Sequence, residues 1–236
     1  MGTMTKLVIL HGWTYQTETW QPLLAQLRAR GVDLEFLLIP GLTDGTNPPP
    51  ASGWTLDDYI EWLRQKTVNC DKVVLYGHSH GGRVSLAFAA KYPEKVQRLI
   101  LEDSAGIPPQ GWRKFKRDLF RRSAETLGRF VRFEKLRSVM RKAIRASDYA
   151  NATPEMRKTM SNLVAEDLAK ILDRIKCPTL IIWGALDTTT PLADGELMHR
   201  GIRGSRMVVL PDARHSPHIT HVQKMVDLIT EELRRS

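Results

Sequence analysis

Short apolar runs alternate with amphipathic stretches along most of this chain, and no other feature restricts its fold as strongly. Apolar runs broken by glycine and proline are typical of buried strands, and apolar residues at helical spacing are typical of covering helices. The expected strands are Lys6–Leu10, Leu34–Ile39, Lys72–Tyr76, Val96–Leu101, Thr179–Trp183 and Arg206–Leu210. The expected helices are Glu18–Arg30, Thr55–Val68, Arg83–Lys91 and Pro217–Leu233. This order predicts an α/β fold with a mostly parallel sheet of about six strands flanked by helices.

The segment from residue 110 to residue 175 departs from this alternation. It carries no strand pattern, and its apolar residues, such as Phe115, Leu119 and Ile144, recur at helical intervals. We therefore expect a helical cap inserted after the strand Val96–Leu101. The 236 residues suffice for one sizeable domain. The expected organisation is a single domain, 1–236, with a core of 1–109 and 176–236 and a cap at about 110–175.

The net charge of +9 at pH 7 originates in this insertion. The stretch Trp112–Arg145 holds 13 Lys and Arg against Asp118, Glu125 and Glu134, a net charge of +10. This concentration of positive charge has three interpretations. The basic side chains cover apolar surface with their stems, attract an anionic substrate or an acidic carrier protein, or make weak contact with an anionic membrane surface. A nucleic-acid partner is not expected, because no recognised binding motif accompanies the charge.

A G-x-S-x-G pattern stands between an expected strand and an expected helix. It reads Gly77-His78-Ser79-His80-Gly81 and is followed by a further glycine. In a nucleophile elbow, the glycines let strand and helix approach closely while the serine takes a strained conformation that exposes its hydroxyl. Because a free serine is a weak nucleophile, it needs a general base within hydrogen-bond reach. The pattern predicts that Ser79 is a catalytic nucleophile.

The base is expected near the end of the chain, in the order serine, acid, histidine. His215 follows the strand Arg206–Leu210 by a short loop, which places it at the carboxyl edge of the sheet, where Ser79 is also expected. His218 and His221 are rivals, although both fall inside or just before the last expected helix. His215 is therefore the predicted base.

Two aspartates compete for the role of triad acid. Asp187 follows the strand Thr179–Trp183, and Asp103 follows the strand Val96–Leu101. A carboxylate in either place can orient the imidazole and stabilise the imidazolium. We favour Asp187, because the acid is expected after the strand that precedes the one leading to the histidine.

An oxyanion hole needs two donors aimed at the carbonyl oxygen of the substrate. The backbone N–H of His80, directly after the nucleophile, is the first expected donor, and that of Trp13, after the first strand, is the second. We expect the imidazole of His11 to brace this loop. The side chain of His80 has two interpretations, contact with the substrate or exposure to solvent.

These pieces together resemble the α/β-hydrolase superfamily over nearly the whole chain. The matching motifs are HGW at 11–13, PG at 40–41, GHSHGG at 77–82, WGALD at 183–187 and the late His215. The HGW start and the small cap are similar to carboxylesterases that include the pimeloyl-carrier-protein methyl ester esterase. The stretch 77–107 also resembles carbon–carbon bond hydrolases of meta-cleavage pathways. The chain departs from the family in having Thr14 where a second glycine is common, and in lacking the usual first hairpin.

The expected function is hydrolysis of a small carboxylic ester, including anionic ones, through an acyl-enzyme on Ser79, with Asp187 and His215 completing the triad. The alternatives are a carbon–carbon bond hydrolase, a lipase and a non-catalytic ligand-binding protein of the same fold. No metal or organic cofactor is required for the ester reaction. Nothing in the sequence specifies an oligomeric state.

The chain starts with polar residues and has no apolar stretch of about 18 residues, which predicts that it has no transmembrane segment. Its two cysteines, Cys70 and Cys177, are widely separated, and this favours a cytoplasmic location.

Overall fold

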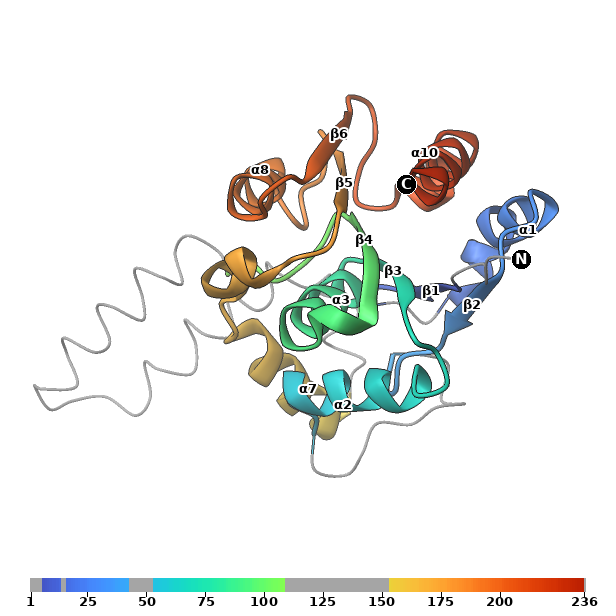
Figure 1. The fold of residues 1–236 in the computed structure, drawn as a ribbon. Coiled ribbons are helices and arrows are strands. Elements are labelled where there is room, and N and C mark those ends of the chain that lie inside the picture. The colour runs from blue at the N-terminus through green and yellow to red at the C-terminus, as the bar shows by residue number, and fades with distance from the viewer. Residues whose placement is uncertain (1–5, 14–15, 43–52, 109–152, 236) are drawn as a thin grey trace, which may run out of the picture.

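A six-stranded parallel sheet forms the centre of the computed structural model, which describes residues 6–13, 16–42, 53–108 and 153–235 (Figure 1). The order of its strands is β2-β1-β3-β4-β5-β6, and each neighbouring pair is parallel. The strands are β1 (Leu7–Leu10), β2 (Leu34–Leu37), β3 (Val73–His78), β4 (Val96–Glu102), β5 (Thr179–Gly184) and β6 (Arg206–Leu210). The expected fold class, a mostly parallel sheet of about six strands flanked by helices, is confirmed.

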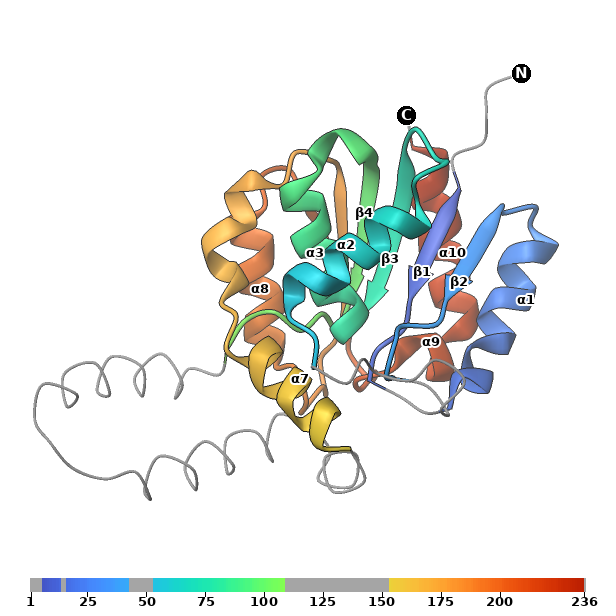
Figure 2. The same cartoon turned by 90° about the horizontal axis from the view of Figure 1, so that it is seen from below.

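Helices cover both faces of the sheet (Figure 2). The α-helices are α1 (Gln21–Ala29), α2 (Leu56–Lys66), α3 (His80–Lys91), α7 (Pro154–Val164), α8 (Leu192–Gly201), α9 (Pro217–Thr220) and α10 (Val222–Arg234). Three 3-10 helices accompany them: η1 (Thr17–Trp20), η2 (Pro93–Lys95) and η3 (Leu168–Arg174). α1 and α10 lie on one face of the sheet, and α2, α3 and α8 lie on the other. Among the described residues, no helix has the length and apolar character that a membrane crossing needs.

The strands are continuous apolar runs because both of their faces are buried. In β4, Leu99 and Leu101 belong to the core on the α2, α3 and α8 side, whereas Ile100 belongs to the core on the α1 and α10 side. All three side chains are fully buried, and each such burial is worth about 1.5–3 kcal/mol. The two cores together fix the sheet between its helical layers.

Two expected helices are divided in the structure. The segment expected as Glu18–Arg30 begins as η1, and α1 follows with Pro22 in its first turn. Proline is tolerated there because N–H groups of the first turn have no acceptor within the helix. The last expected helix, Pro217–Leu233, is broken at His221, whose φ of −128° and ψ of 40° lie outside the helical region. α2 begins as expected, with a capping box between Thr55 and Asp58.

Most of the expected cap lies outside the described residues, including the whole basic stretch Trp112–Arg145. Its described end, from residue 153, contains α7 and η3. Thr153 caps α7 by accepting a hydrogen bond from the N–H of Met156, and α7 packs on the core through Met156, Met160 and Leu163. α7 lies with α9 at the edge of the sheet toward which the strands point (Figure 2).

The strand order creates a topological switch point at this carboxyl edge. β1 and β3 are neighbours, but β1 leads to α1 on one face and β3 leads to α3 on the other. Loops that separate in this way leave space between them, and open α/β sheets bind ligands there. The loop after β1 carries Trp13, and the turn after β3 carries Ser79.

Candidate active site

Ser79 occupies a sharp turn between the last residue of β3 and the first residue of α3. Its φ is +52°, which is strained for a residue with a side chain and costs on the order of 1–3 kcal/mol. Close packing of α3 on β1 enforces the turn, because a Cβ on Gly81 would lie 2.2 Å from the carbonyl oxygen of Leu10. The turn has the strand–serine–helix setting that the G-x-S-x-G pattern predicts.

Ser79, His215 and Asp187 form a continuous chain of hydrogen bonds. Nε2 of His215 lies 3.0 Å from Oγ of Ser79, and Nδ1 of His215 lies 2.7 Å from Oδ2 of Asp187. The three side chains come from the segments after β3, β6 and β5. The Asp187 side chain is fully buried, whereas that of His215 is 17% exposed, so the imidazole faces solvent at the edge where a substrate can enter.

Asp187 is held ionised and oriented by several donors besides His215. Its Oδ1 accepts from the N–H groups of Thr189 at 2.7 Å and Thr190 at 3.1 Å, and its Oδ2 accepts from Oγ1 of Thr190 at 2.6 Å. Burial alone would raise the pKa of this carboxyl, but the hydrogen bond and charge of His215 and the threonine donors lower it below its usual value. Sequence reasoning missed Thr190, which no motif distinguished from the two threonines before it.

The rival acid, Asp103, lies beside this chain of hydrogen bonds without bonding to His215. Its carboxyl, Asp187 and His215 have ligand atoms within 4.8 Å of one another, and its Oδ1 accepts from the N–H of Gly184 at 2.8 Å. Burial, together with the charge of Glu102, raises the pKa of Asp103 to about 9. Asp103 is therefore neutral at pH 7, and a neutral acid does not stabilise an imidazolium as a carboxylate does.

The neutral state of Asp103 has a measurable consequence for stability. Its pKa is 3.8 in an unfolded chain and about 9 in the folded protein, so between these values the folded state binds more protons and stability falls as pH rises. We expect Asp103→Asn to raise the free energy of unfolding at pH 8 by about 1–3 kcal/mol, and to leave it nearly unchanged at pH 4. Urea unfolding at both pH values measures this, and an equal pH dependence in both proteins would contradict it.

The two rival histidines are engaged elsewhere. His218 is buried and bonds through Nδ1 to Oε1 of Glu102 at 3.0 Å, and His221 pairs with the exposed Asp212 at 3.2 Å. Only His215 of the three bonds to Ser79. The structure thus brings together the three residues that the sequence favoured.

A second buried polar cluster supports the loop that carries His215. Glu102 accepts from the hydroxyl of Tyr76 and from the backbone N–H of His218 at 2.8 Å, and Nε2 of His78 bonds to the carbonyl oxygen of His215 at 2.7 Å. Burial lowers the pKa of His78 to about 3, so this imidazole is neutral and its single proton belongs on Nε2, which faces an acceptor.

This cluster also meets the spacing of a metal site, since ligand atoms of His78, Glu102 and His218 lie within 4.8 Å of one another. Burial raises the pKa of the Glu102 carboxyl, but the charge of His218 and the hydrogen bonds from His218 and Tyr76 outweigh burial and lower it to about 2. The carboxylate is ionised and already has donors on both oxygens. The carboxylate therefore has its partners in side chains and backbone, and fits a supporting role.

The loop after β1 lies against Ser79. A Cβ on Gly12 would come within 3.0 Å of Cβ of Ser79, so only glycine allows this approach, and Trp13 follows directly. Nε2 of His11 accepts from the N–H of Ile39 at 3.0 Å, and Nδ1 bonds to the carbonyl oxygen of Gly12 at 2.7 Å. His11 thus braces the loop. The first N–H groups of α3, beginning with that of His80, have no intrahelical acceptor and can bind an anion.

The side chain of His80 is inside the protein. His80 is only 3% exposed, and its ring lies against Tyr59 at a centroid distance of 5.0 Å. The alternative that this side chain points into solvent is therefore wrong. The reason is that Tyr59 of α2 packs against this ring, and Tyr59 is anchored by a hydrogen bond to the carbonyl oxygen of Pro40.

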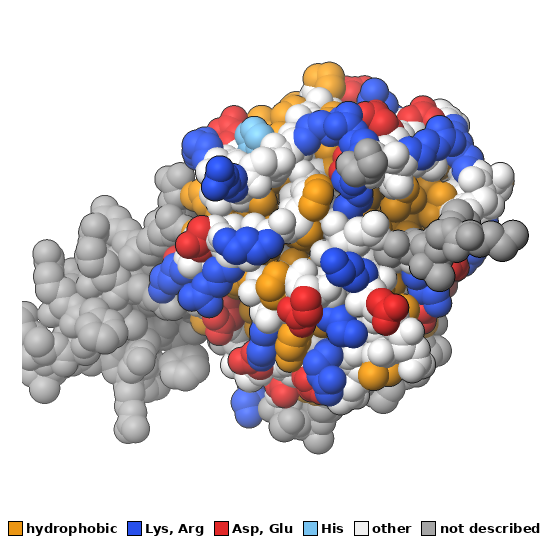
Figure 3. Space-filling view, in the orientation of Figure 1, with side chains coloured by type: hydrophobic (Ala, Val, Ile, Leu, Met, Phe, Trp, Pro, Cys, Tyr) orange, Lys and Arg blue, Asp and Glu red, His pale blue; other side chains and the backbone are white. Residues whose placement is uncertain are grey.

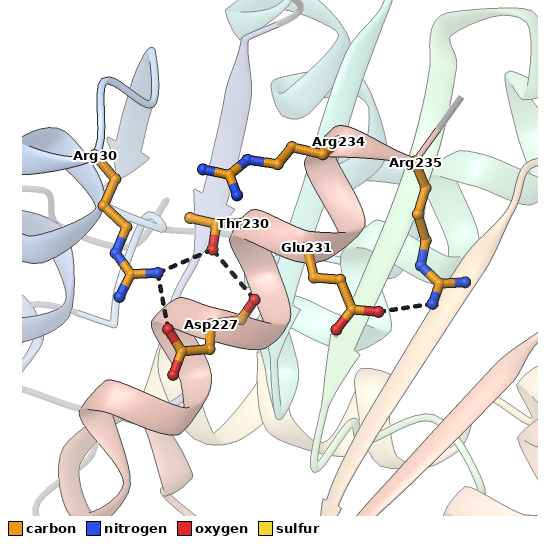
Figure 4. A pocket seen from close by; sticks show the side chains of 6 residues that line it. All are labelled: Arg30, Asp227, Thr230, Glu231, Arg234 and Arg235. Atoms are coloured by element: carbon orange, nitrogen blue, oxygen red, sulfur yellow. Dashed lines mark hydrogen bonds and ion pairs between the residues drawn. The ribbon is translucent and has the colours of Figure 1, made fainter.

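A surface pocket of about 500 Å³ lies between α1 and the end of α10, away from these residues (Figure 4). Four of its five charged side chains pair with one another: Arg30 bonds to Asp227 at 2.8 Å, and Arg235 bonds to Glu231 at 2.6 Å. On the described part of the face in Figure 3, acidic and basic side chains are likewise interspersed. The lining of the pocket includes none of Ser79, Asp187 and His215.

Known proteins match this chain over nearly its full length. The family model of the alpha/beta hydrolase fold matches residues 6–222. A pimeloyl-[acyl-carrier protein] methyl ester esterase of Aromatoleum aromaticum is 30% identical, over 97% of this chain and 98% of its own. A proline iminopeptidase of Saccharolobus solfataricus is 25% identical, over 98% of this chain and 85% of its own. The solved structure of a thermophilic esterase from Thermogutta terrifontis is 26% identical, with a TM-score of 0.72 over 99% of this chain and 91% of that chain.

Proposed function

Because this chain belongs to the alpha/beta hydrolase fold family, we propose that it is a serine hydrolase that cleaves carboxylic esters through an acyl-enzyme on Ser79. The observation that carries the proposal is the chain of hydrogen bonds from Oγ of Ser79 through His215 to Asp187, at 3.0 and 2.7 Å. The esterases among its relatives favour an ester as the substrate.

The first half of the reaction forms the acyl-enzyme. Nε2 of His215 takes the proton of Ser79 as Oγ attacks the ester carbonyl carbon, and Asp187 stabilises the resulting imidazolium. The backbone N–H groups of Trp13 and His80 bind the negative oxygen of the tetrahedral intermediate. When this intermediate collapses, His215 gives the proton to the leaving alcohol, and the acyl group stays on Oγ.

The second half releases the acid. The alcohol departs and a water molecule takes its place beside His215. Nε2 removes a proton from this water as its oxygen attacks the acyl carbon, and the same two N–H groups hold the oxyanion again. Collapse breaks the bond to Oγ of Ser79, which recovers its proton from His215, and leaves the free carboxylic acid.

Peptide-bond hydrolysis is the second candidate, because one relative is named as a proline iminopeptidase. Ser79 can attack an amide in the same way. An amine is a poorer leaving group than an alcohol, however, so it must be protonated by His215 before or as it leaves. Substrates that differ only in their leaving group therefore distinguish the two functions.

Purified protein assayed with p-nitrophenyl esters of two to eight acyl carbons and with matching p-nitroanilides tests this proposal. We expect saturable hydrolysis of the esters and at least about 100-fold lower kcat/KM for the anilides, equivalent to about 2.7 kcal/mol of transition-state stabilisation. Anilides cleaved as well as esters would favour the peptidase. No turnover of either class by folded protein would contradict a hydrolase and favour a ligand-binding protein of the same fold.

A further inference from the structure

Three buried ring nitrogens beside the proposed nucleophile have no hydrogen-bond partner among the described residues. They are Nε1 of Trp13 and both ring nitrogens of His80. Leaving a buried polar atom unpaired costs about 1–3 kcal/mol, and native proteins contain few such atoms. Three of them in adjacent rings therefore indicate a place that something else occupies.

The neighbouring side chains do not supply the missing partners. The ring of His80 contacts Trp13, at a centroid distance of 6.1 Å, and Tyr59, at 5.0 Å, and both contacts are edge-on. The hydroxyl of Tyr59 donates to the carbonyl oxygen of Pro40 at 3.1 Å. Since the aromatic rings pack against the imidazole without bonding to its nitrogens, those nitrogens are left for another molecule.

The two residues that carry these nitrogens, Trp13 and His80, belong to the segments next to Ser79. His80 directly follows Ser79, and Trp13 follows Gly12, at which a Cβ would lie 3.0 Å from Cβ of Ser79. The backbone N–H groups of Trp13 and His80 are also the proposed oxyanion donors. Because the ring nitrogens belong to the same two residues, the proposal places them beside the acyl group of the substrate.

The charge state of His80 defines what the nitrogens can bind. Burial, with smaller contributions from the charges of Arg83 and His11, lowers the pKa of this imidazole well below its usual value, so the ring is neutral. A neutral imidazole offers one N–H donor and one nitrogen acceptor, and the indole of Trp13 offers one donor. Two donors and one acceptor match a hydroxyl group, which both accepts and donates. A carboxylate cannot donate to the acceptor nitrogen.

We propose that Trp13 and His80 form a polar subsite that binds a hydroxyl group on the acyl part of the substrate. This inference rests on the proposed ester hydrolysis, because that reaction places an acyl group beside Ser79. It makes the two side chains specificity-determining residues, which select hydroxyacyl esters over plain alkyl esters of the same length.

The test compares p-nitrophenyl butyrate with the 2-hydroxy- and 3-hydroxybutyrate esters. In the wild type, we expect one hydroxy ester to have a kcat/KM about 10- to 100-fold above that of butyrate, after correction for their rates of alkaline hydrolysis. In His80→Leu, which keeps the backbone N–H but loses both ring nitrogens, the ratio should fall to about 1. His80→Gln, which restores one donor and one acceptor, should recover part of it, and Trp13→Phe should lower it in part.

The outcomes separate the two proposals. If wild-type protein hydrolyses all three esters with equal kcat/KM, the nitrogens bind only water, and the subsite proposal is wrong while ester hydrolysis stands. A hydroxyl preference that persists unchanged in His80→Leu also contradicts the subsite. If none of the esters is hydrolysed, the proposed function fails, and the subsite fails with it.

Discussion

Replacing Ser79 with alanine is expected to lower kcat/KM for p-nitrophenyl esters by at least about 10⁴-fold. The change removes only Oγ, which lies 3.0 Å from Nε2 of His215 and forms the acyl-enzyme in the proposed reaction. Alanine takes the strained φ of +52° about as readily as serine does, so we expect the free energy of unfolding to stay within about 1 kcal/mol of the wild type. Steady-state kinetics together with urea unfolding measure both quantities.

Ser85→Ala is the matched control. Ser85 lies in α3, the helix that begins directly after Ser79. It is fully buried, and its Oγ has no hydrogen-bond partner among the described residues. It should hydrolyse esters within about twofold of the wild type, since surrounding contacts are preserved. A Ser79→Ala protein that keeps wild-type activity, or a Ser85→Ala protein that loses it equally, would exclude Ser79 as the nucleophile.

Asp187→Asn is expected to lower kcat by about 10⁴-fold with a much smaller change in KM. Asparagine keeps the size of the side chain but replaces the carboxylate, so nothing stabilises the imidazolium of His215. In the wild type, Nδ1 of His215 lies 2.7 Å from Oδ2 of Asp187. If the NH2 group of the asparagine faces Nδ1, the imidazole proton moves to Nε2, and Nε2 can then no longer accept the proton of Ser79. Single-turnover kinetics would localise the loss in the chemical step.

Asp103→Asn provides the contrast, because the two aspartates lie side by side and both substitutions are isosteric. Asp103 is already neutral at pH 7, its pKa being raised to about 9 by burial and the charge of Glu102, so the amide imitates its working state. We expect activity within about threefold of the wild type, together with the gain in stability described above. Reversed effects of the two substitutions would make Asp103 the triad acid.

The fold and the sharp turn that carries Ser79 could be predicted from the sequence because each rests on local patterns. Apolar runs such as Val96–Leu101 indicate strands buried on both faces. Glycine is required beside Ser79 because a Cβ on Gly81 would lie only 2.2 Å from a backbone oxygen. His215 could be placed because parallel strands bring the segments that follow them to one edge. Strand ends were predicted to within two residues, and Arg206–Leu210 without error.

Features that depend on contacts between distant segments could not be predicted. Asp103 and Asp187 each follow a strand at the same edge, and only the hydrogen bond to His215 distinguishes them. The support of the His215 loop by Glu102 and His78 joins positions more than 100 residues apart. The break at His221 follows from its backbone angles rather than from a helix-breaking residue type.

The burial of His80 is a further case of this kind. Its position after the nucleophile allowed either contact with the substrate or exposure, and the packing of Tyr59 against its ring decided for burial. Most of the expected cap, including its basic stretch Trp112–Arg145, lies outside the described residues, so the interpretations of that charge stay predictions.

Covalent labelling tests the proposed activation of Ser79 most directly. A fluorophosphonate probe reacts with a serine that a general base activates, and intact mass measurement followed by peptide mapping locates the adduct. For the folded wild type, we expect one adduct, on Ser79, with labelling slowed strongly in His215→Ala and absent in Ser79→Ala. An unlabelled, well-folded wild type, or an adduct that remains in Ser79→Ala, would show that Ser79 is not the activated nucleophile.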